Sequence, residues 1–367
     1  MIKAAINKNP WAQLVKLDLS ALVVVTSGGG YVLSGGSLFD LFTLTGLLVG
    51  TTMCASSAAT FNQILERNFD KQMARTKKRP LVTGVISLSA GKTFGWGMGL
   101  GGVFLLTTAC NPLTALLGGA TILLYTHVYT PLKRMTRFNT EVGAIVGAIP
   151  PVMGWTAAMG TTGLASVETA LLAGTLFCWQ MHHFMTIAWN QRKDYARAGY
   201  LMQSLGDDDG KRTATKGLAW AVAMFALPPI AYVAGVSTAM FVVSGTVVNG
   251  LMVHSFWRFY KSRTDEYARK ARIHGFVQLV FFMGLMVFHI HDRHEITAFV
   301  QLSWLGKTGY NFCAHKAVEG KDHLCVYLFG RKTKPDHHEE VAPNTDLHQL
   351  LSREGSKEAL EGSCQSS

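Results

Sequence analysis

The chain has 367 residues, of which 49% are hydrophobic and 16% are charged, and its mean hydropathy is +0.20. This composition excludes an ordinary soluble globular domain and favours a protein that crosses a membrane several times. The net charge of +11 would also suit nucleic-acid binding. Because the charges gather in a few loops between apolar segments, we expect no nucleic-acid partner. The six cysteines are too scattered to form a disulfide framework.

The chain starts with a short basic segment, residues 1–19, which carries Lys3, Lys8 and Lys16 and no acidic residue before Asp18. This segment is compatible with mitochondrial targeting, although it lacks the arginines typical of such sequences.

Apolar stretches then follow one another, and about 20 apolar residues are needed for a helix to cross a bilayer. The stretch at 94–110 is rich in glycine, which predicts close packing against a neighbouring helix. The sequence predicts an all-α membrane domain over residues 20–292, with nine transmembrane helices at about 20–36, 40–60, 94–110, 112–129, 140–160, 164–189, 217–236, 238–257 and 275–292.

The loops between these spans carry their charge on one side. Lys and Arg gather in the even-numbered loops at 67–79, 133–137, 192–216 and 258–272, whereas the odd-numbered loops contain none. This positive-inside pattern predicts that the N-terminus and the basic loops face the mitochondrial matrix or the bacterial cytoplasm. We favour the mitochondrial inner membrane over a bacterial plasma membrane because of the basic start and the long tail.

The tail, residues 293–367, is polar towards its end and is predicted to be largely disordered. It also contains Cys313, His315, His323 and Cys325, which suggest a zinc site. Their spacing is not that of a standard zinc motif, so we favour the interpretation without a metal.

The first chemical motif follows the second predicted span. Asn62, Glu66 and Asp70 are spaced four residues apart, so on a helix their oxygens lie along one face. Mg²⁺ binds hard oxygen ligands and often shares carboxylates with substrate phosphates. Arg75, Lys78 and Arg79 come next, and such cations bind phosphate oxygens. The motif therefore indicates a site for Mg²⁺ and a diphosphate, although helix-end ion pairing alone would also explain it.

A second motif repeats this arrangement after the sixth predicted span. Asn190 and Asp194 form another pair of oxygen ligands, with Arg192 between them. Both motifs are predicted to face the same compartment, so they indicate a shared polar cavity.

At these motifs the chain resembles the UbiA-type intramembrane prenyltransferases, and most closely their protohaem IX farnesyltransferase group. The resemblance covers residues 12–292 and is carried by the stretches Asn62–Leu81, Tyr129–Arg134, Asn139–Trp155 and Trp179–Tyr200. It implies helices around a central membrane cavity, Mg²⁺ as cofactor, and transfer of farnesyl from farnesyl diphosphate to a vinyl group of haem b. The product implied is haem O, and haem A synthase or oxidase-assembly proteins are the partners to expect.

The resemblance also implies roles for particular residues. Asn62, Glu66, Asp70 and Asp194 take the catalytic and metal-binding positions, with Asn190 as a further metal ligand. The basic residues expected to neutralise the departing diphosphate are Arg75, Lys78, Arg79, Lys133, Arg134, Arg137 and Arg192.

Histidines are the candidates for haem binding, because neutral imidazole ligates haem iron. His183 is the first candidate, followed by His182 and His127. The family usually has proline where His182 stands. The helix kink that a proline would produce at this position is therefore in doubt for this chain.

Two other functions fit the same features. One is a UbiA-type enzyme that prenylates an aromatic acid or quinone precursor, against which the Trp179–Tyr200 stretch argues. The other is a transporter of an anionic solute, which would need an aqueous path to both faces.

Overall fold

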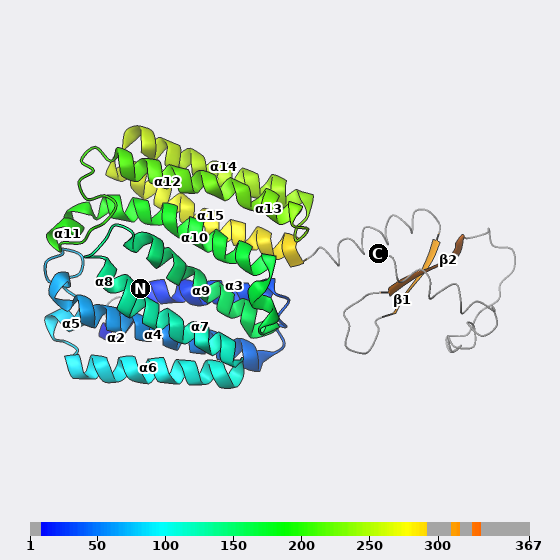
Figure 1. Cartoon of the computed structure of the whole chain (residues 1–367), viewed down its shortest axis with the longest axis horizontal. Coiled ribbons are helices and arrows are strands. Elements are labelled where there is room, and N and C mark those ends of the chain that lie inside the picture. Colours follow the sequence, from blue (N-terminus) through cyan, green and yellow to red (C-terminus); the bar gives the residue numbers. More distant parts are fainter. Residues whose placement is uncertain (1–8, 292–309, 316–324, 332–367) are drawn as a thin grey trace. The chain divides into compact units, whose positions relative to one another are not determined.

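The computed structural model describes residues 9–291, 310–315 and 325–331. The chain divides into two units, Met1–Thr297 and Ala298–Ser367. In the first unit, long helices run side by side and are joined by short helices and loops (Figure 1). Its helices in the first half are α2 Pro10–Leu14, α3 Leu17–Leu33, α4 Leu41–Asp70, α5 Pro80–Thr83, α6 Leu88–Ala109, α7 Pro112–Leu123, the π-helix η1 Leu124–Tyr129, α8 Thr130–Leu132 and α9 Asn139–Met159. The second half contributes the 3₁₀ helices η2 Thr162–Ala165 and η3 Met224–Ala226, and α10 Val167–Asn190, α11 Arg192–Arg197, α12 Lys211–Ala223, α13 Leu227–Val233, α14 Ala239–Ser262 and α15 Asp265–His291.

Each predicted span overlaps one or more helices of the described chain, although several spans run past the helix ends, and the membrane-protein class is confirmed. Among the described residues, six helical stretches are long and apolar enough to cross a membrane. Helix α3 is shorter, and α6 and α10 are not among these six. The six are Leu41–Asp70, Pro112–Leu132, Asn139–Met159, Lys211–Val233, Ala239–Ser262 and Asp265–Ile290.

Helix α4 continues well past the predicted span at 40–60, as far as Asp70. It starts at Asp40, whose carboxylate accepts a hydrogen bond from the Thr43 N–H at 3.1 Å. Its 30 residues correspond to about 45 Å of helix, whereas a hydrocarbon core is about 30 Å thick. The last turns of α4, which carry the first motif, are therefore long enough to extend beyond the apolar part of a bilayer.

The glycines of the predicted span at 94–110 pack α6 closely against α4, as expected. A Cβ on Gly102 would lie 3.0 Å from the Cys54 backbone nitrogen, and one on Gly99 would lie 2.8 Å from the Ser57 hydroxyl. Gly95 is also in this face, where its backbone carbonyl accepts a hydrogen bond from Ser57 Oγ at 2.8 Å. The small residues thus hold α4, and with it the first motif, against a neighbouring helix.

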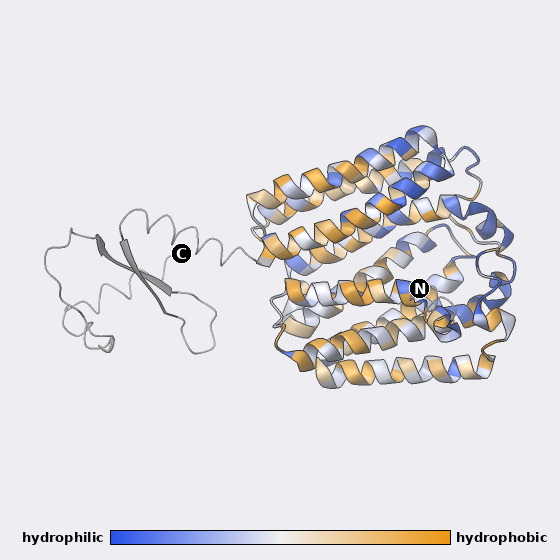
Figure 2. Ribbon diagram, turned by 180° about the vertical axis from the view of Figure 1, so that it is seen from behind, coloured by the Kyte–Doolittle hydropathy of each residue, from blue (hydrophilic) through white to orange (hydrophobic). Residues whose placement is uncertain are grey.

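The helices of the second half are held together by a core of aromatic residues. Phe241 and Phe256 from α14 and Phe282 from α15 are almost fully buried there. Other large apolar side chains, such as Phe39 and Val233, are exposed, as expected for residues that face lipid. Hydrophilic residues concentrate at one end of the helical unit, where α5 and α11 lie (Figures 1 and 2).

In the second unit the structure describes two strands, β1 Tyr310–His315 and β2 Cys325–Arg331, which pair antiparallel. The all-α prediction did not include this hairpin. Of the residues suggested for zinc, Cys313 and His315 lie in β1 and Cys325 in β2, while His323 lies outside the described residues. The remainder of the tail that we predicted to be disordered also lies outside them.

Candidate functional site

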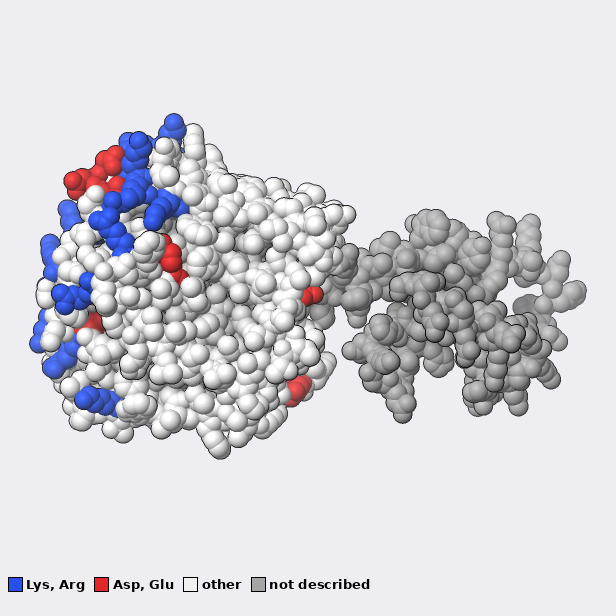
Figure 3. Space-filling view, viewed as in Figure 1, with Lys and Arg blue, Asp and Glu red and all other residues white. Residues whose placement is uncertain are grey.

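Basic side chains gather at one end of the helical unit, as the loop pattern predicted (Figure 3). The end of α4, the start of α5, α8 and α11 meet at this end (Figure 1). The two motifs found in the sequence are therefore brought to the same end of the bundle.

The first motif is buried, and each of its three side chains meets a basic partner. Asn62, Glu66 and Asp70 are 0%, 5% and 1% exposed. The amide oxygen of Asn62 accepts a hydrogen bond from Lys16 Nζ at 2.6 Å. Glu66 Oε1 lies 2.6 Å from Lys133 Nζ, and Asp70 Oδ2 lies 2.6 Å from the Arg79 guanidinium. Ion pairing of exposed groups at a helix end does not describe this motif, because its side chains are removed from water and paired across separate segments.

An unusual turn of helix fixes the amide of Asn62. The chain forms the π-helix η1 just before Pro131, which has no N–H to donate and crowds the preceding turn. The Thr130 hydroxyl satisfies the Tyr125 carbonyl at 2.8 Å and also accepts from Asn62 Nδ2 at 2.9 Å. Because the amide nitrogen is committed to Thr130, the amide oxygen is directed to Lys16.

The ammonium of Lys133 lies close to the aromatic rings of two tyrosines. Its ammonium lies 4.6 Å from the centroid of Tyr129 and 5.9 Å from that of Tyr200. Burial alone would lower the pKa of Lys133, but the Glu66 carboxylate beside it raises that pKa above its usual value. The Lys133 ammonium therefore faces both the Glu66 carboxylate and two tyrosine rings, whose faces attract cations.

The two motifs are joined directly. Asp194 Oδ2 accepts a hydrogen bond from the backbone N–H of Arg75 at 3.2 Å, and Asp194 Oδ1 lies 3.2 Å from the Arg197 guanidinium. Asn190, at the end of α10, is half-buried. No group of three or more His, Cys, Asp or Glu side chains within the described ranges is close enough to hold a metal ion. The carboxylates would therefore hold a metal only together with oxygens from a ligand.

One atom of the first motif fits a metal ligand particularly well. Asp70 Oδ1 is buried and has no hydrogen-bond partner in the part of the chain that the structure describes, while Oδ2 is engaged by Arg79. A buried carboxylate oxygen without a partner is costly, so a cation or water is needed there. The donor set of Asn62, Glu66 and Asp70 consists of hard oxygens, which is the chemistry that Mg²⁺ prefers.

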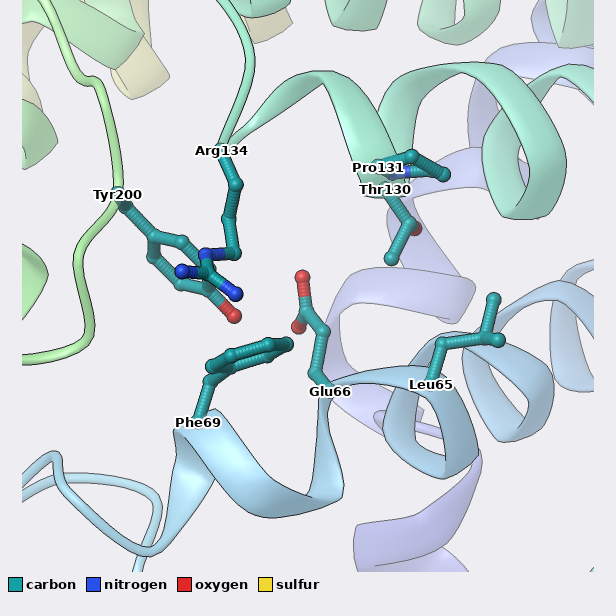
Figure 4. Close-up of a pocket in the computed structure, with 7 residues that line it drawn as sticks. All are labelled: Leu65, Glu66, Phe69, Thr130, Pro131, Arg134 and Tyr200. Carbon is teal, nitrogen blue, oxygen red and sulfur yellow. The ribbon is translucent and has the colours of Figure 1, made fainter.

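A pocket of about 210 Å³ leads to Glu66. Figure 4 shows the Glu66 carboxylate near its centre, with the Tyr200 hydroxyl and the Arg134 guanidinium pointing towards it. The Arg134 guanidinium lies 4.4 Å from the centroid of the Phe69 ring. The wall is completed by three residues that are mostly apolar, namely Leu65, Thr130 and Pro131. The pocket therefore combines charge with apolar surface, as an amphiphilic ligand requires.

The other basic residues expected at the site differ in their surroundings. Arg75, Lys78 and Arg137 are exposed at the basic end. Arg192 is committed elsewhere, since its guanidinium binds Asp265 at 2.6 Å and the Trp189 carbonyl at 2.7 Å and lies over the Trp189 ring. Arg79, Lys133 and Arg134 are the members of the expected set that reach Glu66, Asp70 or the pocket beside them.

The three histidines also differ. His182 is fully buried against Phe256 and Gly275, and neither ring nitrogen has a hydrogen-bond partner among the described residues. His183 is half-buried and stacks on Trp179 with ring centroids 4.5 Å apart. His127 is exposed, and its Nδ1 is hydrogen-bonded to Thr126 Oγ1 at 2.7 Å. Of the two histidines on α10, His183 is therefore the more exposed, whereas His182 is enclosed by its neighbours.

Three residues of the site were not found from the sequence: Lys16, Thr130 and Tyr200. Lys16 was assigned to the basic N-terminal segment, and nothing in its spacing connects it to Asn62. Thr130 had one signal, because a threonine in a helix can donate its hydroxyl to a backbone carbonyl of the preceding turn, as Thr130 does to Tyr125.

Known proteins resemble this chain over most of the helical unit. The model of the UbiA prenyltransferase family matches residues 22–286. The mitochondrial protohaem IX farnesyltransferase of Arabidopsis thaliana is 40% identical over 285 residues, which are 77% of this chain and 65% of that protein. The human mitochondrial protein of that name is 42% identical over 260 residues, 71% of this chain and 57% of its own length. The chain thus spans about three fifths of these two relatives.

A bacterial relative and two solved structures extend this comparison. The protohaem IX farnesyltransferase of Opitutus terrae is 35% identical over 279 residues, which are 76% of this chain and 93% of that protein. A digeranylgeranylglyceryl phosphate synthase has a TM-score of 0.62 at 13% identity, over 76% of this chain and 96% of its own. A UbiA homologue from Archaeoglobus fulgidus bound to GPP and Mg²⁺ has a TM-score of 0.54 at 14% identity, over 76% and 99%.

The match to the family model covers both oxygen-rich motifs and the helices that carry them. The structural matches show the same fold, and the family model extends over α4 to α14 and most of α15. The chain belongs to the UbiA prenyltransferase family, within its protohaem IX farnesyltransferase group.

Proposed function

We propose that the protein transfers the farnesyl group of farnesyl diphosphate to a vinyl group of haem b and so makes haem O. The observation that carries this proposal is the buried Asn62–Glu66–Asp70 stripe with a basic side chain against each member. Neighbouring cations and hard oxygens in a membrane protein suit the head group of an isoprenoid diphosphate. The names of the plant, human and bacterial relatives support haem as the acceptor.

Mg²⁺ is the metal that we propose for this site, supported by the free oxygen of Asp70 and by the Mg²⁺ bound to the archaeal homologue. Asn62, Glu66 and Asp70 would hold it, with Asp194 and Asn190 as ligands from the second motif. When bound, the metal would supply positive charge to the diphosphate oxygens as the leaving group departs. Arg79, Lys133 and Arg134 would add fixed charge to the same oxygens.

The reaction that follows from this arrangement starts with ionisation of the allylic diphosphate. The bond between the farnesyl C1 and oxygen breaks, and diphosphate takes the electron pair. The vinyl group then attacks C1, and water adds to the resulting cation with loss of a proton. The faces of Tyr129 and Tyr200, which already lie near the Lys133 ammonium, would stabilise an allylic cation, and the surrounding apolar helices would exclude water until the bond has formed.

The acceptor would lie towards α10. His183 is the histidine that we propose for haem contact, because it is half-buried whereas His182 is enclosed. We also propose nine membrane-spanning helices, with the basic end in the matrix of mitochondria. The alternative is that the basic end faces the cytoplasm of a bacterium. The protein partners that we propose are haem A synthase or oxidase-assembly proteins.

The test is to incubate the purified protein with haem b, farnesyl diphosphate and Mg²⁺ and to measure the mass of the haem. We expect the mass to rise by one farnesyl group and one hydroxyl group, with no further hydrogen, because the two former vinyl carbons keep their three hydrogens. No gain on haem, together with prenylation of a phenolic acid, would establish the related activity on an aromatic precursor instead. Solute flux in vesicles without prenyl transfer would establish a transporter.

A further inference from the structure

The N-terminal segment contributes a side chain to the site. Lys16 lies between α2 and α3, in a left-handed backbone conformation with φ 50°. Its ammonium reaches Asn62 Oδ1 at 2.6 Å and the Tyr125 hydroxyl at 3.4 Å. A residue other than glycine adopts this conformation only when its surroundings require it. The strained backbone of Lys16 thus goes together with the hydrogen bond from Lys16 to Asn62, which joins the N-terminal segment to the first motif.

The residues around Lys16 hold it in this place. Gln63, the neighbour of Asn62, donates from Nε2 to the backbone carbonyls of Gln13 and Leu14 at 2.8 and 2.9 Å. Leu14 is fully buried, and the ring of Trp11 packs on Phe94 with centroids 5.1 Å apart. The segment before Lys16 is therefore anchored to α4 and α6, and its position depends on the residue next to Asn62.

Lys16 differs from the other two bases that meet the stripe. Lys133 and Arg79 each face a carboxylate, whereas Lys16 faces the neutral amide of Asn62 and a phenol hydroxyl. Among the described residues, the Lys16 ammonium contacts two neutral oxygens and forms no ion pair with a carboxylate. A diphosphate oxygen would supply the negative charge that the Asn62 amide and the Tyr125 hydroxyl do not, so Lys16 is placed to bind an anionic ligand.

We propose that Lys16 binds the diphosphate group of the substrate and that the N-terminal segment, held by Gln63, is part of the active site. The proposal rests on the proposed function for the chemical class of the ligand. Lys16 would act as a point charge on a diphosphate oxygen. Gln63 is a positioning residue, because it reaches the ligand only through the backbone that carries Lys16.

The experiment measures the Kd for inorganic diphosphate by calorimetry, with the full chain in nanodiscs, Mg²⁺ present and no haem. Lys16→Met keeps the length and apolar part of the side chain but removes its charge, and we expect the Kd to rise on the order of 10- to 100-fold. Lys16→Arg keeps the charge and should bind within a few-fold of the wild type. The matched control is Lys92→Met, an exposed lysine of α6, which should leave the Kd unchanged.

Gln63→Leu tests the anchor and remains informative where Lys16→Met does not fold. It should weaken diphosphate binding in the wild-type background and have little further effect in Lys16→Met, because both changes act on the same contact. An unchanged Kd in Lys16→Met or in Gln63→Leu would overturn the proposal. The proposal would also be overturned if the effects of Lys16→Met and Gln63→Leu on the Kd were additive in the double variant.

These results are separable from the proposed function. Binding is measured without an acceptor, so it does not depend on whether haem or another molecule receives the prenyl group. A mass gain on haem by a Lys16→Met protein with wild-type diphosphate affinity would leave the proposed function intact and overturn the role of Lys16. A wild-type protein that makes no haem product, together with a Lys16→Met protein that loses diphosphate affinity, would overturn the proposed function and leave the role of Lys16 intact.

Discussion

The two oxygen-rich motifs look alike in the sequence but lie in different environments. Around Asn62–Asp70 the charged groups are buried and paired at 2.6 Å with bases from three separate segments. Around Asp194 the contacts are longer, and Arg197 is mostly exposed at 61% of its side chain. The first motif is therefore a preorganised charge site. The second motif mainly connects the loop after α4 to α11, through the hydrogen bond between Arg75 and Asp194.

The largest effect is expected from Asp70→Asn. The change keeps the size of the side chain but removes the charge that faces Arg79 and the oxygen that lacks a partner. Farnesyl transfer to haem should fall by about 10²- to 10³-fold, as when a single group that stabilises transition-state charge is removed. Mass analysis of the haem measures it. Asp265→Asn, in an exposed pair at the same end, serves as control, and equal losses in both variants would mean that the effect of Asp70→Asn does not depend on its place in the first motif.

A loss of stability is expected from Lys133→Met. It leaves Glu66 as a buried charge with one base removed, which typically costs about 3–5 kcal/mol. Thermal unfolding in detergent should show a lowered midpoint. Combining it with Glu66→Gln removes both charges, so the double variant should be more stable than Lys133→Met alone. If the double variant were the less stable, the ion pair would not be the reason for the loss.

A smaller effect is expected from Thr130→Val, which keeps the shape of the side chain. It removes the hydroxyl that holds the Asn62 amide and leaves the buried Asn62 Nδ2 without this partner, at a cost of about 1–3 kcal/mol. Activity should fall more than stability, because the amide of Asn62 is then free to turn. Thr130→Ser retains the hydroxyl and should restore activity. Activity unchanged in Thr130→Val would mean that the orientation of Asn62 is set by other contacts.

The smallest effect is expected from Arg192→Gln. Its guanidinium binds Asp265 and stacks on Trp189, and a partly exposed ion pair contributes about 0–1 kcal/mol. Haem farnesylation by this variant should remain within about twofold of the wild type, which corresponds to less than 1 kcal/mol. Arg79→Gln, by comparison, should impair the reaction strongly. A loss in Arg192→Gln as large as that in Arg79→Gln would restore Arg192 to the diphosphate site, where the sequence had suggested it.

Much of this arrangement was predictable because it depends on local periodicity. A spacing of four residues places Asn62, Glu66 and Asp70 on one face in any helix, and apolar stretches of sufficient length predict helices wherever they occur. The packing of α6 through glycine was likewise readable from the sequence. By contrast, the burial of the stripe and the different surroundings of Arg79 and Arg192 arise from contacts between distant segments, which no local pattern encodes.

The membrane class, the approximate helical stretches and the spacing of the first motif follow from the sequence, since hydropathy and helical spacing are properties of neighbouring residues. Which cation meets which oxygen depends on the tertiary structure. Lys16, Lys133 and Arg79 are separated along the chain by other helices, and each reaches the stripe only because the helices pack together at one end. The pairing of charges depends on distances through space, so it became visible only in the folded chain.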